Sequence, residues 1–237
     1  MTPVRLRCDL RLRVDLHVHT RYSDGNGTVD EVLRAARGRG LDAIAVTDHG
    51  TTGGYLKARA RARGLTIIPG LEVRTDAGHV LVLGIEEPVG TGGPVRYEDL
   101  IGEVRDRGGL AILAHPALGR PRMGRWARCR PDAVEALNAL YPLFGWQVGR
   151  GISIASALGL PGVGGSDAHL PSSVGDAYTV VEADGAGPWH VLEAIRAGHA
   201  RPGGGPSPIA VRLRVGLGYV GFLIRHKLSR LQTRRRV

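Results

Sequence analysis

Short apolar runs alternate with segments of helical spacing along most of the chain, from residue 14 to about residue 198. This alternation is typical of α/β proteins, in which parallel strands are joined by crossover helices. The apolar runs predict strands at 14–18, 43–47, 65–69, 79–85, 110–114, 133–137, 161–164 and 177–182. Helical spacing predicts a first helix that starts at Thr28 and ends at Gly38 or Gly40, and further helices at 53–63, 97–107, 146–158 and 188–197.

Local signals set the ends of some of these elements. Thr28 and Glu31 have the spacing of a capping box, and Pro188 suits the first turn of a helix. The stretch "RPGGGPSP" at 201–208 contains six Gly or Pro residues and indicates a linker. We therefore predict one domain over 1–200, a linker over 201–208 and a basic amphipathic tail over 209–237.

Composition supports a globular fold and locates the charge. The chain has 237 residues, of which 43% are hydrophobic and 23% are charged, which is enough for one full core. The net charge is +10, but the first 210 residues hold 24 basic and 22 acidic residues, for a net charge of +2. The last 27 residues hold eight basic residues and no acid. A nearly neutral body thus carries a basic tail, and the overall charge does not by itself indicate nucleic-acid binding.

Cysteine use and the ends of the chain favour a cytoplasmic protein. Cys8 and Cys129 lack the spacing of a thiolate metal site or of a disulfide framework. The N-terminal residues alternate between apolar and basic and lack the apolar stretch of a signal peptide. The longest uncharged run of the tail, 215–224, is shorter than the roughly 20 residues that a membrane span needs.

Six of the nine histidines lie at predicted strand ends or edges, mostly beside carboxylates. They are His17 and His19 in "DLHVH", His49 in "VTDHG", His79 in "GHVLVLG", His115 in "ILAHP" and His169 in "GSDAH". In parallel α/β folds the carboxyl ends of the strands meet at one crevice, which holds the functional groups.

Residue spacing points to a metal centre. In an extended strand His17 and His19 face the same side, and imidazoles with carboxylates suit Zn, Mn or Fe. Glu72, Asp24 and Asp167 are candidates for a carboxylate that bridges two ions. A single histidine of this kind is more often a packing or surface residue than a ligand. The full set is hard to explain by packing, because burying so many unpaired polar groups is costly.

The segments "DLHVHTRYSDG", "VTDHG", "GLE", "GHVLVLG", "AHP" and "GSDAH", in this order, resemble the motifs of the PHP (polymerase and histidinol phosphatase) domain superfamily of metal-dependent phosphoesterases. The resemblance runs from about Val14 to Arg201. It implies a distorted (β/α)7 barrel with two or three divalent ions (Mn, Zn or Fe) at the C-terminal mouth of the strands.

The resemblance also implies a set of ligands. One ion would be held by His17, His19, Glu72 and Asp167. Glu72 would bridge to a second ion held by His79 and His115, while Asp24, His49 and His169 would hold a third. Asp15 and Asp48 lie beside ligands and are expected to orient the imidazoles by hydrogen bonds without binding an ion themselves.

Such a site would use a metal-bridging hydroxide, held by Glu72, Asp167 and His115, to attack phosphorus. Arginines bind phosphate oxygens well, and the candidates are Arg21, Arg120, Arg122 and Arg125, each of which is otherwise a solvated surface residue. Asn138 matches a family position near the mouth and is a further candidate for substrate binding.

The leading hypothesis is a hydrolase acting on phosphomonoesters of a small metabolite or nucleotide. The span of about 35 residues between His79 and His115 leaves little room for an inserted substrate domain. One alternative is an exonuclease or oligonucleotide phosphatase that binds nucleic acid through the basic tail. Another is a non-catalytic module in which the ions stabilise the barrel and the tail docks on a partner or, as the weaker option, on a membrane surface.

Overall fold

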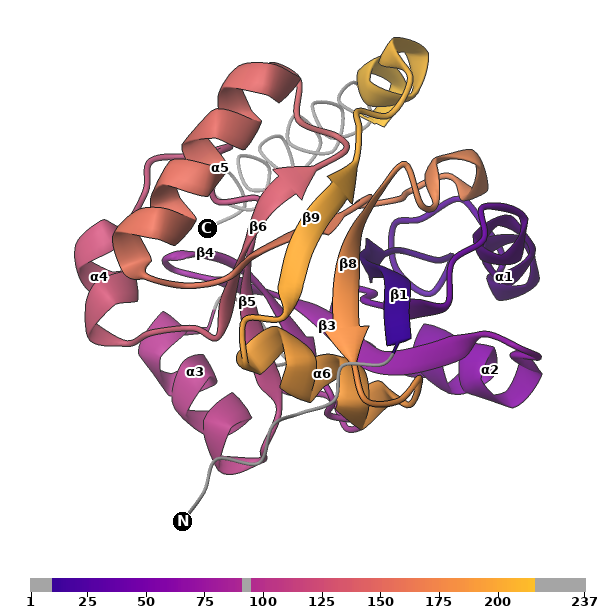
Figure 1. The fold of residues 1–237 in the computed structure, drawn as a ribbon, viewed down its shortest axis with the longest axis horizontal. Helices are drawn as coiled ribbons and strands as arrows, with labels where there is room; N and C mark the ends of the chain where they lie inside the picture. Colours follow the sequence, from indigo (N-terminus) through magenta and orange to yellow (C-terminus); the bar gives the residue numbers. More distant parts are fainter. Residues whose placement is uncertain (1–9, 91–94, 216–237) are drawn as a thin grey trace, which may run out of the picture.

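A nine-stranded sheet, curled into a nearly closed barrel, forms the centre of the computed structural model, which describes residues 10–90 and 95–215 (Figure 1). The strand order is β7-β6-β5-β4-β3-β2-β1-β8-β9. The strands are β1 (Leu10–Val18), β2 (Ala43–Val46), β3 (Thr66–Thr75), β4 (Gly78–Leu83), β5 (Leu110–Ala114), β6 (Ala133–Asn138), β7 (Gly162–Gly165), β8 (Ala177–Ala183) and β9 (Ala200–Gly204). The predicted α/β barrel is confirmed.

Most strands run in the same direction, so their carboxyl ends meet at one end of the barrel. β1, β2 and β3 pair in parallel, as do β5, β6 and β7. β4 is antiparallel to both β3 and β5, and β8 is antiparallel to both β1 and β9. We call the end at which β1, β2, β3, β5, β6 and β7 finish the mouth. β4 begins at the mouth because it runs the opposite way.

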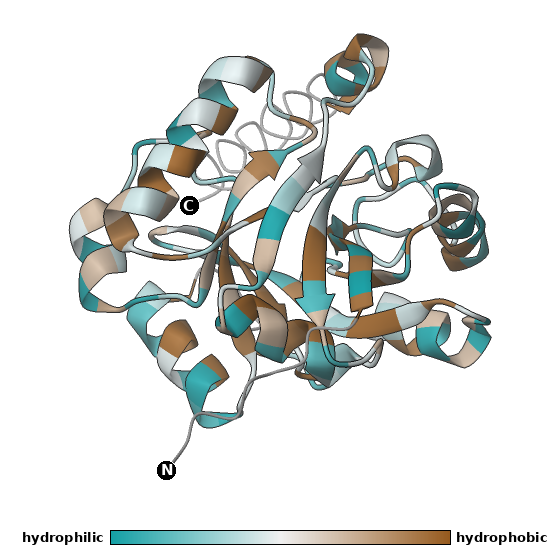
Figure 2. Cartoon of the chain, viewed as in Figure 1, coloured by the Kyte–Doolittle hydropathy of each residue, from teal (hydrophilic) through white to brown (hydrophobic). Residues whose placement is uncertain are grey.

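Helices cover the outside of the barrel: α1 (Val29–Gly38), α2 (Gly53–Arg61), α3 (Tyr97–Asp106), α4 (Met123–Arg128), α5 (Phe144–Leu158) and α6 (Pro188–Arg196) (Figure 1). One core cluster joins the strands of the barrel to α6 and includes Leu12, Val14 and Leu16, which alternate along β1. Two further clusters pack α1 and α2, or α3 and α5, on the sheet. The apolar residues accordingly follow the strands and the sheet-facing sides of the helices (Figure 2).

The predicted helix start at Thr28 is confirmed in detail. The Thr28 hydroxyl accepts the main-chain N–H of Glu31, and the Glu31 carboxylate accepts the main-chain N–H of Thr28 at 2.8 Å. These two hydrogen bonds are those of a capping box. They fix the start of α1 directly after the loop that carries Asp24.

The predicted linker at 201–208 is wrong for its first half, because residues 201–204 belong to β9. Gly203 pairs with Tyr178 and Gly204 with Ala177 of β8. A Cβ at Gly204 would lie 2.3 Å from the Asp176 carbonyl oxygen, and the φ of this residue is 88°. The glycines thus permit close pairing with β8 instead of forming a flexible connection.

Beyond β9 the chain returns to the mouth. The main-chain N–H of Ser207 donates to the Ala139 carbonyl at 2.9 Å, and residues 209–215 are helical. Arg212 donates to the carbonyls of Tyr141 and Pro142, just after β6. Most of the predicted amphipathic tail, 216–237, lies outside the described residues. In the described part of the chain, none of the helices has both the length and the apolar character needed to cross a membrane.

Candidate metal centre

Nine side chains at the mouth supply a continuous cluster of imidazoles and carboxylates. His17 and His19 come from the end of β1, Glu72 from β3 and His79 from the start of β4. The others lie in the loops that follow strands: Asp24 after β1, His49 after β2, His115 after β5, and Asp167 and His169 after β7. The structure therefore brings together all the residues for which metal ligation is predicted.

The most buried group contains His17, His19, Glu72 and Asp167, whose ligand atoms all lie within 4.8 Å of one another. Glu72 Oε2 lies 3.1 Å from His17 Nε2 and 3.2 Å from His19 Nε2. Asp167 Oδ1 lies 3.3 Å from each of the same two nitrogens. Two imidazoles and two carboxylates thus point at one position, as the spacing of His17 and His19 predicts.

A second group shares Glu72 with the first. Glu72 Oε1 lies 2.7 Å from His79 Nδ1 and 3.0 Å from His115 Nε2, while Oε2 faces the first group. The two oxygens of one carboxylate therefore face two different pairs of imidazoles. This is the arrangement that a carboxylate bridging two ions requires.

The third group differs in one member from the predicted set. His19, Asp24 and His169 form this group, with Asp24 Oδ2 at 3.2 Å from His169 Nε2. His49 lies close by, with its Nε2 at 3.6 Å from Asp24 Oδ2 and 3.4 Å from Glu72 Oε2. His49 thus stands between the buried groups and the third group instead of belonging to the third alone.

Three features of the cluster fit a divalent cation. His17 Nδ1 is hydrogen-bonded to Glu135 Oε1 at 3.0 Å, so a neutral His17 that keeps its proton on Nδ1 would offer the lone pair of Nε2 to a cation. His17 Nε2 lies only 3.1 Å from His19 Nε2, so at most one of them can carry a proton directed at the other. His19 Nδ1 is buried and has no hydrogen-bond partner among the described residues, although Asp24 Oδ1 lies 3.4 Å away. Nitrogens that converge in this way suit a shared cation.

Without a cation, the charges of the cluster are balanced by protons on the imidazoles. Burial alone would lower the pKa of His19, but its hydrogen bonds to Asp167 and Glu72 raise that pKa to about 10. Burial would likewise raise the pKa of Glu72, yet the His17 charge and the imidazole hydrogen bonds hold it well below the usual value. A divalent cation would therefore bind in exchange for protons.

The backbone is unusual at two of these positions. His115 has a φ of 31° and Asp167 a φ of 53°, in the left-handed region that residues other than glycine seldom adopt. The His115 main-chain N–H donates to Glu135 Oε2 at 2.7 Å, and the Asp167 carbonyl lies 2.8 Å from His169 Nδ1. These contacts hold the two strained residues, as is common at functional sites.

Glu135 is a functional residue that the sequence interpretation missed. It lies buried on β6, where its carboxylate binds His17, the main-chain N–H of His115 and the Asn138 amide. A Cβ at Gly165 would lie 2.5 Å from Glu135 Oε1, so the glycine leaves room for the carboxylate. The signal in the sequence was an acid inside the apolar run 133–137, because a buried acid needs partners.

Asn138 supports the cluster, and its predicted role in substrate binding is corrected. The side chain is fully buried, and its amide nitrogen donates to Glu135 Oε2 at 3.0 Å and to Asp167 Oδ2 at 3.2 Å. Its amide oxygen accepts the main-chain N–H of Leu140. Both ends of the amide are thus used within the protein, and Asn138 orients Asp167.

Asp15 and Asp48 also differ from the prediction, which had them orient imidazoles. Asp15 accepts hydrogen bonds from the Ser166 hydroxyl and from the main chain of His17, Ser166 and Gly175. Asp48 accepts hydrogen bonds from the main chain and hydroxyl of Thr20 and from the Ser23 hydroxyl. Both carboxylates therefore hold the loops that carry the ligands, and Glu135 binds the imidazole of His17.

The candidate arginines lie outside the cluster. Arg21 is exposed and donates to the Asn26 carbonyl of its own loop at 2.9 Å, and Arg120 and Arg122 are exposed in the segment after β5. Their role in substrate binding stays a prediction. Arg125 is bound to two carboxylates, those of Asp76 and Glu98, which corrects its assignment as a phosphate ligand.

Two family models match the chain. One, described as PHP domain, matches residues 15–111, and the other, described as PHP-associated, matches residues 145–200. The first range contains the ligands from His17 to His79, and the second contains Asp167 and His169. The two matches thus cover the strand ends at which most of the cluster lies.

Three curated proteins are similar in sequence. The uncharacterized protein MJ1587 of Methanocaldococcus jannaschii is 31% identical over 150 residues, which make up 55% of this chain and 84% of that protein. A phosphoribosyl 1,2-cyclic phosphate 1,2-diphosphodiesterase of Eggerthella lenta is 41% identical over 81 residues, or 31% of each chain. A 3',5'-nucleoside bisphosphate phosphatase of Chromobacterium violaceum is 42% identical over 79 residues, which are 31% of this chain and 28% of the enzyme.

A solved structure shares the fold. It is a two-domain protein of Bacteroides vulgatus that contains a predicted PHP-like metal-dependent phosphoesterase. The TM-score is 0.71 at 21% sequence identity, and the match covers 84% of this chain and 66% of that one. At this identity the likeness establishes the barrel and not the substrate.

Proposed function

The chain belongs to the PHP domain family, and from that premise we propose that it hydrolyses phosphomonoesters of a small metabolite or nucleotide. It is a metal-dependent phosphoesterase, since the Eggerthella lenta and Chromobacterium violaceum relatives are enzymes that act on phosphate esters and the cluster suits divalent ions. We further propose that two or three ions of Mn, Zn or Fe are bound.

The position of Glu72 carries this proposal. Its two carboxylate oxygens face separate pairs of imidazoles, His17 with His19 and His79 with His115. Ions held at these positions would supply an activated water and neutralise the phosphoryl oxygens of the ester. Packing alone does not require each oxygen of a carboxylate to face a separate pair of imidazoles.

The exposure of the side chains indicates where the ester approaches. The side chains of His17, His19 and Glu72 are at most 2% exposed, whereas His49 is 36% and Asp24 is 52% exposed. The phosphate would therefore enter from the side of His49 and Asp24, with the buried ligands beneath it. On the buried side, Glu135 and Asn138 hold His17 and Asp167 in position.

The relatives support a substrate that contains a phosphorylated sugar or nucleoside. The names of the Eggerthella lenta and Chromobacterium violaceum enzymes give a phosphoribosyl cyclic phosphate and a nucleoside bisphosphate as their substrates. The matched segments cover under a third of each of these enzymes. We therefore propose the class of substrate and not either compound.

The test is a hydrolysis assay of the full chain loaded with Mn. An aryl phosphate should be hydrolysed, a chelator should abolish the reaction, and added Mn or Zn should restore it. The substrate panel should contain phosphomonoesters, nucleoside bisphosphates, cyclic phosphates and short oligonucleotides, with Asp167→Ala and His115→Ala as inactive variants. Equal activity of these variants and the wild type would refute the assignment of the site.

A preference for oligonucleotides would favour the nuclease alternative instead. Activity would then depend strongly on salt concentration, because each phosphate contact of the basic tail releases counterions. Removal of residues 216–237, which carry six of the eight basic residues of the last 27, should reduce that dependence. If the salt dependence of activity is unchanged after truncation, the nuclease alternative is wrong and the phosphomonoesterase proposal is retained.

A further inference from the structure

An exposed tryptophan lies close to the mouth, at the start of α5. Trp146 is 62% exposed, and the guanidinium of Arg150, one helical turn later, lies over its ring at 5.3 Å from the centroid. A cation thus lies over one face of the indole, and most of the side chain is open to solvent. Such a ring is a stacking surface for a planar group.

The chain fixes this ring near the ligands. α5 follows β6, whose last residue, Asn138, is hydrogen-bonded to Asp167. Arg150 Nη1 donates to the Ala117 carbonyl at 3.2 Å, and Ala117 lies two residues beyond His115, a chain distance of at most ~7 Å. Arg150 therefore connects the ring to the loop that carries His115.

The first turn of α5 is also held in place. The side chain of Gln147 is buried and accepts the main-chain N–H of Leu143 at 2.7 Å. In the preceding loop, the Tyr141 carbonyl accepts a hydrogen bond from Arg212 at 3.0 Å. The first turn of α5 and the loop before it are thus already ordered before a ligand binds to Trp146. A rigid binding surface loses less conformational entropy on binding.

The guanidinium of Arg150 makes no ion pair with a described carboxylate. Among the residues that the structure describes, no carboxylate lies within ion-pair distance of Arg150, whereas Arg59, Arg107 and Arg196 each bind a glutamate. Its contacts are the Ala117 carbonyl and the Trp146 ring. The positive charge is thus available to a substrate with phosphate groups.

We propose that Trp146 stacks on the base of a nucleotide whose phosphate lies at the metal centre. The inference rests on the proposed function and narrows its substrate class to mononucleotides. A base offers a planar π-face to the open side of the indole, which a sugar phosphate without a base lacks. Trp146 would be a specificity residue, and Arg150 a positioning residue that holds the ring.

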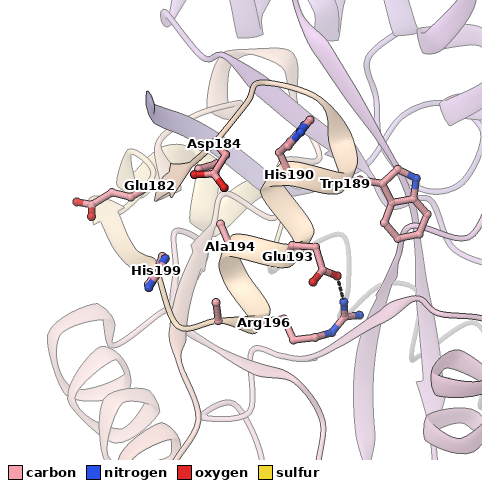
Figure 3. A pocket seen from close by; sticks show the side chains of 10 residues that line it. Glu182, Asp184, Trp189, His190, Glu193, Ala194, Arg196 and His199 are labelled. Carbon is pink, nitrogen blue, oxygen red and sulfur yellow. Dashed lines mark hydrogen bonds and ion pairs between the residues drawn. The ribbon is translucent and has the colours of Figure 1, made fainter. Parts of the chain in front are cut away.

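A second exposed tryptophan provides a matched control. Trp189 is 55% exposed and lies in the first turn of α6, which follows β8 at the end of the barrel opposite the mouth. It lines a surface cavity together with Glu182, Asp184 and Glu193, and Arg196 in this cavity is bound to Glu193 (Figure 3). Trp189 has comparable exposure but lies at the end of the barrel away from the metal ligands, and the cavity beside it contains three acidic residues.

The test compares AMP with ribose 5-phosphate, which lacks the base. Trp146→Ala should raise the KM for AMP about tenfold more than the KM for ribose 5-phosphate, from the usual strength of base stacking. Trp146→Phe should recover most of the loss because it retains an aromatic face. Trp189→Ala should leave both values unchanged. An equal effect of Trp146→Ala on the two substrates would overturn the proposal.

A measurement without turnover separates this inference from the proposed function. Adenosine should quench tryptophan fluorescence in the wild type and in Trp189→Phe, and the quenching should disappear in Trp146→Phe. Quenching that persists in Trp146→Phe would overturn the stacking site even if phosphomonoesters are hydrolysed. Quenching that depends on Trp146 in a protein without hydrolytic activity would support the stacking site and refute the proposed function.

Discussion

Replacing Glu135 by glutamine should weaken metal binding, although Glu135 is not itself one of the grouped ligands. Its two oxygens accept hydrogen bonds from three donors: His17 Nδ1, the His115 main-chain N–H and the Asn138 amide. A glutamine has one acceptor oxygen and one NH2 group of similar shape. Either His17 or the pair of His115 and Asn138 must then face a second donor.

Each outcome of this conflict has a cost that can be stated. If the glutamine NH2 faces His17, the ring must accept at Nδ1 and carry its proton on Nε2, the nitrogen that faces Glu72 and Asp167. If the NH2 faces the other side, buried donors lose their acceptor, at about 1–3 kcal/mol. Partners of metal-bound histidines typically contribute 10- to 100-fold to metal affinity, so we expect a loss of that order for Glu135→Gln.

Titration of the chelator-treated protein with Mn or Zn, followed by calorimetry, measures this affinity directly. Glu182→Gln is the matched control, because Glu182 is an exposed glutamate of β8, far from the mouth. It should bind the metal as the wild type does. Wild-type affinity in Glu135→Gln, within about twofold, would refute the idea that this carboxylate sets the proton position on His17.

Three further predictions concern stability. Thr28→Ala removes the capping box of α1 and should lower the free energy of unfolding by ~1 kcal/mol in urea denaturation, with Thr28→Ser close to the wild type. Gly204→Ala should lower the free energy of unfolding by more than ~1 kcal/mol in the same assay, because the φ of Gly204 is 88° and a Cβ would meet the Asp176 carbonyl. An unchanged denaturation midpoint would contradict the pairing of β9 with β8. In metal-free protein the pKa of His19 is about 10, above its unfolded value of 6.5. The protonated imidazole therefore contributes fully to the free energy of unfolding below pH 6.5, and this contribution is lost as the pH rises towards 10. A cation displaces that proton, so added Mn should raise Tm more at pH 8.5 than at pH 6.5. An equal rise in Tm at the two pH values would contradict this exchange of a proton for the cation.

The elements that the sequence predicts well are those whose stability is local or simply apolar. The helix at Thr28 is marked by its own capping residues, and the strands near 43–47 and 110–114 are apolar on both faces because helices cover the barrel. β9 could not be predicted in this way. Its glycines form a strand only because Tyr178 and Asp176 of the neighbouring chain segment approach closely, which is a tertiary effect.

The same division holds at the site. Ligands next to strand ends, such as His115 and Asp167, are recognisable because their position in a parallel fold determines where they meet. The sequence pattern does not mark Glu135 and Asn138 as residues of this kind. Their roles depend on which side chains of other strands and loops lie opposite them. Sequence spacing thus predicts which residues meet at the mouth, but the partners that orient them follow from contacts of β6 side chains with His17 of β1 and with Asp167 after β7.

The exposure of the cluster argues against ions that serve only to stabilise the barrel. Structural metal sites are closed by protein ligands on all sides, whereas catalytic sites keep a position open for water or substrate. Here one side is closed, because His17, His19 and Glu72 are buried and supported by Glu135. The other side is open at Asp24, whose carboxylate is half exposed while it contacts His169. A site that is closed beneath and open above leaves a position beside the buried ligands for water or a substrate, which a closed structural site lacks.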